Sequence, residues 1–138
     1  MKRKEDMMKA VFEVVPKEKV AKWVRSLHSK NPSLILAILL GGERWRCVKE
    51  VVVAKIKNKI VGVATIAPEG EEMNGEPTLV ALYVLPQHRK KGIGFQLFEK
   101  AIDYMLQKGW EPIRIEVLTS NVMRMINRLP EEKCEKLN

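Results

Sequence analysis

The sequence of 138 residues has little of what marks secreted or membrane proteins. Its two cysteines, Cys47 and Cys134, are too few for a disulfide framework and lack the spacing of metal ligands. The longest apolar run, around residues 34–40, is far shorter than the roughly 18 residues that a membrane-spanning helix needs. The basic N-terminus is not followed by an apolar stretch with a cleavage site. We therefore expect one cytoplasmic domain over residues 1–138, with no metal and no membrane partner.

Positive charge is in excess, with 25 Lys and Arg against 17 Asp and Glu, for a formal net charge of +8. A basic surface attracts anions such as nucleic acids, acidic lipids or small phosphate-bearing ligands. The group Arg44, Trp45 and Arg46 suits stacking and phosphate contacts with a nucleic acid, but a structural Trp at the entrance of a strand fits it equally. The acidic residues near 69–76 could attract a cationic amine. Net charge alone does not choose between these partners.

The spacing of apolar residues predicts alternating strands and helices. Strands are expected over residues 8–15, 51–57, 60–66, 78–85 and 112–118, and helices over 16–28, 32–40, 92–107 and 121–129, the last capped by Asn121. The strand, helix and strand from Thr78 to Leu118 form a crossover unit, which makes the two strands parallel. The fold class is therefore α/β, with a central mixed sheet of about six strands flanked by helices.

The segment after the buried strand at residues 78–85 carries the chemistry. A cationic turn that contains no acid is followed by a helix that starts within a glycine pair, giving the motif Arg89-x-x-Gly92-x-Gly94. The first N–H groups of a helix have no intrahelical partner and carry partial positive charge, and glycines there let a bulky anion approach. We interpret the motif as a phosphate cradle, although it is not a P-loop. The alternative is that the glycines serve helix packing and that the cationic side chains only make a turn hydrophilic, without binding a ligand.

On this motif, the sequence resembles the GNAT superfamily of acetyl-CoA-dependent N-acetyltransferases, whose signature Gln/Arg-x-x-Gly-x-Gly/Ala opens the helix after the fourth strand. The resemblance covers about residues 8–129 and includes the order of elements. It implies acetyl-CoA as the acyl donor, with its pantetheine arm between diverging fourth and fifth strands and main-chain donors at Val84 polarising the thioester carbonyl. It also implies that Asn121 contacts the cofactor. The residues that it assigns to cofactor binding are Leu82, Tyr83 and Val84 for the pantetheine arm, Arg89, Lys90, Lys91, Gly92, Ile93 and Gly94 for the diphosphate, and Asn121.

The sequence departs from the family in three places. Arg128 stands where many members have a Tyr that acts as general acid, and Thr78 stands where some have a Glu that acts as base. Tyr104 lies within a predicted helix and is expected to pack rather than to react. The catalytic residues are therefore unassigned. Only residues 130–138 follow the last predicted helix, so the usual C-terminal strands are shortened, and a second subunit in a homodimer could cover the open edge.

The sequence thus predicts an N-acetyltransferase that moves an acetyl group from acetyl-CoA to a primary amine of a small molecule or peptide. The missing acid and base leave open a CoA-binding regulatory module without turnover. A basic nucleic-acid-binding protein is a further alternative of a different class.

Overall fold

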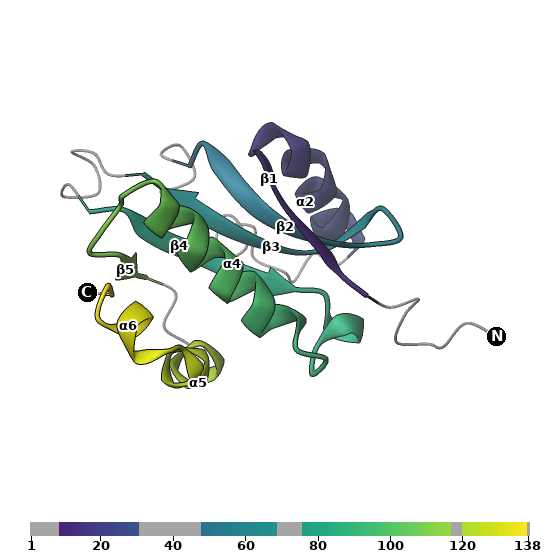
Figure 1. Ribbon diagram of the computed structural model, residues 1–138. Helices are drawn as coiled ribbons and strands as arrows, with labels where there is room; N and C mark the ends of the chain where they lie inside the picture. Colours follow the sequence, from purple (N-terminus) through teal and green to yellow (C-terminus); the bar gives the residue numbers. More distant parts are fainter. Residues whose placement is uncertain (1–8, 31–47, 69–75, 117–119, 138) are drawn as a thin grey trace.

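A computed structural model describes residues 9–30, 48–68, 76–116 and 120–137, and the fold is described for these residues (Figure 1). Five strands form one sheet in the order β1-β2-β3-β4-β5. The strands are β1 (Val11–Pro16), β2 (Glu50–Ile56), β3 (Lys59–Ala67), β4 (Thr78–Val84) and β5 (Arg114–Ile115). The helices are α2 (Glu18–Lys30), the short 3-10 helix η3 (Pro86–His88), α4 (Ile93–Gln107), α5 (Ser120–Arg128) and α6 (Glu131–Cys134).

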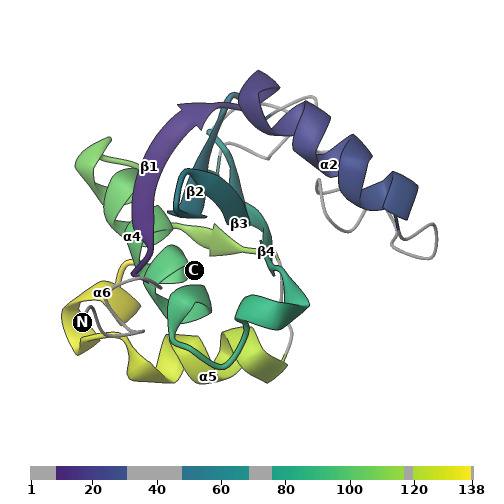
Figure 2. The same ribbon diagram turned by 90° about the vertical axis from the view of Figure 1, so that its right-hand side faces the viewer.

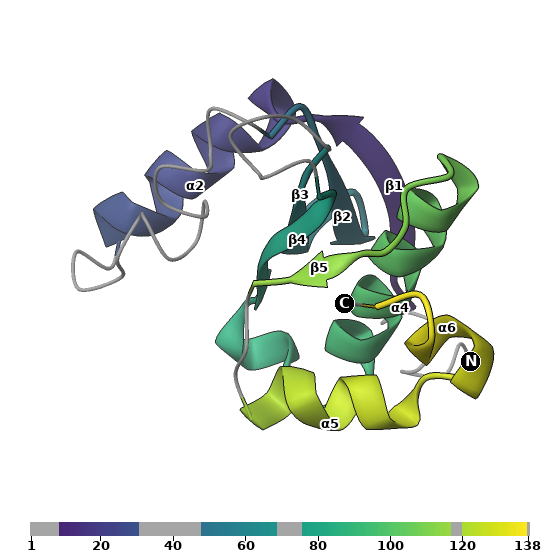
Figure 3. The same ribbon diagram turned by 90° about the vertical axis from the view of Figure 1, so that its left-hand side faces the viewer.

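The sheet is mixed and has a helix on each face, which confirms the predicted fold class. Strands β1 to β4 are antiparallel neighbours, whereas β4 and β5 are parallel and are joined through α4. Helix α4 covers one face and α2 covers the other, as Figures 2 and 3 show. The α4 face holds the larger core, and the buried stripe of α4 consists of Ile93, Leu97, Phe98, Ala101, Ile102 and Met105.

The predicted hairpin in the middle of the chain is present. Strands β2 and β3 pair from Glu50 with Ile66 to Ile56 with Lys59. The two residues that connect them, Lys57 and Asn58, have φ angles of 52° and 66°. Such left-handed pairs form the tight turns whose twist matches that of the flanking strands.

Some sequence predictions differ from the structure or fall outside the described residues. The described sheet has five strands rather than six, and β5 pairs only over Arg114–Ile115 instead of the predicted 112–118. Helix α5 begins at Ser120, so Asn121 lies in its first turn and the prediction that it caps the helix is wrong. Ser and Asn are both common at helix starts, so the sequence alone does not decide whether the helix begins at Ser120 or after Asn121. Three predicted features lie outside the described residues: the helix 32–40, the group Arg44, Trp45 and Arg46 (the Trp45 cluster), and the acidic residues 69–72.

The C-terminal segment packs onto the body of the protein. Lys133 of α6 lies 2.8 Å from an Asp103 carboxylate oxygen and 3.3 Å from one of Glu99, both on α4. The N–H of Ile113 donates to the carbonyl of Lys136 at 2.7 Å, and Leu137 forms one parallel bridge with Ile113. The segment therefore contributes a single bridge beside β5, in place of a full strand. In the described part of the chain, no helix has the length and apolar character that crossing a membrane requires.

Tyr104 packs at the C-terminal end of α4, as predicted. Its hydroxyl donates to a carboxylate oxygen of Glu50 on β2, and its ring meets that of Trp110 edge to face, with 6.1 Å between centroids. The Lys108 ammonium lies 5.5 Å from the centre of the Tyr104 ring. These groups line a pocket of about 220 Å³ between the end of α4, the start of β2 and the end of β3. Tyr104 therefore packs against neighbouring side chains at the end of α4 that is remote from the helix start.

We expect Tyr104 to titrate far above an ordinary tyrosine. Burial raises the pKa of Tyr104 to about 12, and the hydrogen bond to Glu50 and its negative charge act in the same direction. Because the folded-state pKa lies above the unfolded value near 10, the contribution to stability is complete below pH 10 and is lost as the pH rises toward 12. Tyrosinate absorbance against pH measures this, with Tyr104→Phe assigning the transition. Glu50→Gln should lower the pKa only part of the way, and an unchanged pKa would mean that Glu50 does not contribute.

Candidate functional site

The start of α4 is open to solvent. Gly92 precedes the helix with a φ angle of 83°, and a Cβ added there would meet no atom within 4 Å. No side chain caps the helix. The Gly92 carbonyl accepts from Gln96 at 3.1 Å, while the N–H groups of residues 90–95 have no backbone acceptor in the described part of the chain. These donors give the helix start partial positive charge, as in helix starts that bind phosphate.

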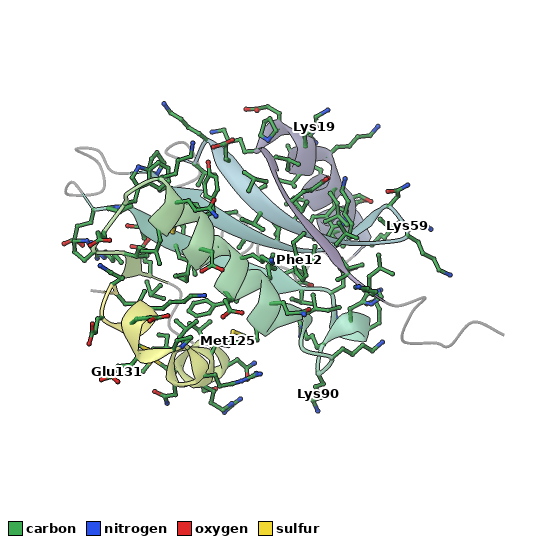
Figure 4. All side chains as sticks on the ribbon, in the orientation of Figure 1. Phe12, Lys19, Lys59, Lys90, Met125 and Glu131 are labelled. Carbon is green, nitrogen blue, oxygen red and sulfur yellow. The ribbon has the colours of Figure 1, made fainter. Side chains whose placement is uncertain are left out.

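The two glycines of the motif have different tasks. Gly92 faces open space, whereas a Cβ at Gly94 would lie 3.1 Å from the Met125 Cε of α5. Figure 4 shows Met125 at the side of α5 that faces α4. Gly94 therefore lets α5 approach the first turn of α4 closely. The packing interpretation therefore fits Gly94, whereas the phosphate cradle at Gly92 stays a prediction.

The parallel strands beside the helix start separate after a short pairing. The N–H of Arg114 donates to the Pro77 carbonyl at 2.9 Å, and that of Glu116 donates to the Leu79 carbonyl at 3.0 Å. The pairing register of β3 and β4 then skips Val80, which forms a bulge. Beyond Leu79, this edge of β4 has no strand partner among the described residues. The edge thus offers main-chain groups to an extended ligand in a direction that leads to the start of α4.

Two cations of the loop, Arg89 and Lys90, point in different directions. Lys90 and Lys91 are exposed, and Figure 4 shows Lys90 projecting away from the body. The Arg89 side chain instead turns back to β4, where its Nε donates to the Val84 carbonyl at 2.8 Å. Its guanidinium carbon lies 5.3 Å from the centre of the Tyr83 ring. Arg89 and Lys90 therefore do not lie together, although the sequence alone placed all three cations at the start of the helix.

The positions where relatives carry an acid or a base hold neither here. Thr78 is fully buried and its hydroxyl donates to the Glu76 carbonyl at 3.0 Å. The Arg128 guanidinium lies 4.0 Å from the centre of the Phe95 ring on the first turn of α4. Asn121 is exposed, and its amide oxygen accepts from Arg124. This leaves the Asn121 amide N–H groups to donate to a ligand.

Two features of the site were not visible in the sequence. The bulge at Val80 depends on the register between β3 and β4, and the contact of Met125 with Gly94 depends on how α5 crosses α4. Neither has a local signal. Among the described residues, no group of three or more His, Cys, Asp or Glu is placed to hold a metal ion.

The geometry defines a class of protein: a mixed α/β protein whose diverging parallel strands and open helix start suit an extended ligand with a diphosphate. A family model described as "Acetyltransferase (GNAT) family" matches residues 10–127, and the chain belongs to this family. Its acyl donor is acetyl-CoA, whose diphosphate and amide-bearing arm fit these two features.

Solved structures of low sequence identity share the fold. A ribosomal-protein-alanine N-acetyltransferase from Brucella melitensis biovar Abortus 2308 is 18% identical, with a TM-score of 0.57 over 92% of this chain and 86% of that one. A GNAT family acetyltransferase from Brucella melitensis in complex with acetyl-CoA is 14% identical, with a TM-score of 0.63 over 85% and 81%. An aminoglycoside acetyltransferase from an uncultured soil metagenomic sample, in complex with sisomicin, is 18% identical, with a TM-score of 0.61 over 90% and 88%. No curated protein sequence matches the chain.

Proposed function

We propose that this acetyltransferase moves the acetyl group of acetyl-CoA to a primary amine. The observation that carries the proposal is the open helix start at Gly92 beside the edge of β4, which has no strand partner beyond Leu79 in the part of the chain that the structure describes. When bound, acetyl-CoA supplies an activated acetyl thioester that a neutral amine can attack. The Arg89 N–H already donates to the Pro86 carbonyl at 3.2 Å, so main-chain N–H groups of residues 90–94, and not that of Arg89, would bind the diphosphate. Main-chain groups of residues 82–84 would align the arm.

In this proposal, positioning is the contribution of the described residues to the rate. Thr78 and Arg128 offer no proton acceptor or neutral acid, so an amine that arrives in its neutral form is the reactive species. Its nitrogen bonds to the acetyl carbonyl carbon, the C–S bond then breaks, and the proton that the nitrogen loses passes to the departing CoA thiolate directly or through water. Holding donor and amine in a reactive geometry removes much of the entropic cost of their encounter. Main-chain donors at the end of β4 would stabilise the oxygen on which negative charge develops.

The amine acceptor is a small molecule or a peptide in this proposal. Titration calorimetry with acetyl-CoA should show one binding site per chain, and mass spectrometry should then detect acetyl transfer to members of a panel. The panel contains aminoglycosides, polyamines and peptides with a free N-terminus or a lysine. Absence of acetyl-CoA binding would overturn the proposal.

A CoA-binding module without turnover is the second candidate. It is favoured by the same two positions, because Thr78 is bonded to the main chain and Arg128 is stacked on Phe95. Binding of acetyl-CoA without transfer to any member of the panel would select it. The nucleic-acid-binding alternative rests on the Trp45 cluster, and it stays a prediction, as do the homodimer, the single domain over 1–138 and the cytoplasmic location.

A further inference from the structure

Arg89 is the cation of the motif that contacts the end of β4. Its Nε donates to the Val84 carbonyl at 2.8 Å, and its guanidinium carbon lies 5.3 Å from the centre of the Tyr83 ring. A planar guanidinium both donates in a fixed direction and stacks on an aromatic ring, which a lysine ammonium cannot reproduce. The Arg89 side chain therefore makes two contacts with β4, and these contacts, in addition to its charge, set its orientation.

The Val84 carbonyl lies on the edge of β4 that a cofactor arm would use. The N–H of Leu85 donates to the Val61 carbonyl of β3 at 2.8 Å. Because the C=O and N–H of a trans peptide point in opposite directions, the Val84 carbonyl points away from β3. On that same side, β5 donates to Pro77 and Leu79 at the other end of β4. Arg89 thus binds the edge beyond the point where β5 stops.

Val84 also connects the strand to the start of α4. A Cβ placed on Gly62 would lie 3.3 Å from Val84 Cγ2, and one placed on Gly94 would lie 3.8 Å from the same atom. The Val84 side chain consequently lies between β3 and the first turn of α4. A change in the orientation of the Val84 peptide would alter how the strand edge and the helix start are aligned.

We propose that Arg89 is a positioning residue, which fixes the Val84 peptide so that the edge of β4 is in line with the phosphate-binding helix start. This inference rests on the proposed function. It assigns Arg89 to the alignment of the pantetheine arm, whereas the diphosphate is bound by main-chain N–H groups and attracted by the exposed Lys90 and Lys91.

Calorimetry with two ligands separates these roles. The ligands are CoA and 3′-phospho-ADP, which is CoA without the pantetheine arm. Arg89→Lys keeps the charge but loses the Nε donor and the stacking plane, so we expect CoA affinity to fall about tenfold and 3′-phospho-ADP affinity to change less than twofold. The matched control is Lys91→Ala, which removes a charge from the same loop. The affinity for both ligands should fall by one common factor, roughly twofold to fivefold at low salt.

Equal losses for both ligands in Arg89→Lys, or no loss for either, would overturn the inference and leave Arg89 as a phosphate ligand or a bystander. Tyr83→Leu gives a second test in a chain that keeps Arg89. It should lower the affinity for CoA but not that for 3′-phospho-ADP, and by a smaller factor than Arg89→Lys does. Thermal unfolding of each variant shows whether it is folded. Failure of the unmodified protein to bind CoA would instead overturn the proposed function, so the two failures are distinguishable.

Discussion

Replacing Gly92 by glutamate is expected to abolish CoA binding while the protein stays folded. A Cβ at this position meets no atom within 4 Å, so the new side chain has room and enters the space in front of the helix start. There its carboxylate would accept from the free N–H groups and repel the diphosphate. We expect the affinity for CoA, measured by calorimetry, to fall at least about 100-fold. The φ angle of 83° makes any side chain costly, so stability should fall by about 1–2 kcal/mol.

Gly109 supplies a matched control for this experiment. It has a φ angle of 75°, and a Cβ there also meets no atom within 4 Å, but it follows the C-terminal end of α4. Gly109→Glu therefore introduces the same charge and a similar backbone strain at a site remote from Gly92. It should lose a similar amount of stability and bind CoA normally. If Gly92→Glu bound CoA as tightly as the unmodified protein, the diphosphate would have to bind elsewhere.

The parts of the site that could be predicted from the sequence are those set by local chemistry. The break after β4, the cationic turn and the glycine at the start of α4 all lie within a few residues of one another. The buried stripe of α4 was equally predictable, because Leu97, Phe98, Ala101, Ile102 and Met105 follow helical spacing and all are buried. A helix start and an amphipathic face need no knowledge of the rest of the chain.

The parts that could not be predicted depend on neighbours far away in sequence. The bulge at Val80 is a property of the register between β3 and β4, and the short pairing of β5 depends on where two parallel strands diverge. Arg89 was expected at the phosphate because of its charge, yet the Val84 carbonyl and the Tyr83 ring give its side chain specific contacts. A charge pattern predicts the attraction of an anion but not the direction of each side chain.

Phe98→Ala is expected to give the largest loss of stability. Phe98 is fully buried, and it belongs to the core that packs α4 onto the sheet. Removing a large buried ring loses its transfer free energy and leaves a cavity, which together cost about 3–5 kcal/mol. That is a large share of the roughly 5–15 kcal/mol of a typical domain, so denaturant unfolding should show a much lower midpoint. Met123→Ala is the control, since Met123 is 50% exposed on α5 and its loss should change stability by less than about 0.5 kcal/mol.

The same variant also tests whether the binding site depends on the core beneath it. CoA binds only the native state in our proposal, so at 100 times its dissociation constant it should stabilise the unmodified protein by about 2.7 kcal/mol. Phe98 lies a little more than one turn into α4, and its ring contributes to the core, whereas in the proposal the N–H groups of residues 90–94 bind the ligand. If the helix start keeps its geometry, CoA should stabilise Phe98→Ala by the same free energy at the same ratio of ligand to dissociation constant, and that constant should change little. A large rise in the dissociation constant would show that core packing, and not only the local backbone, holds the helix start in position.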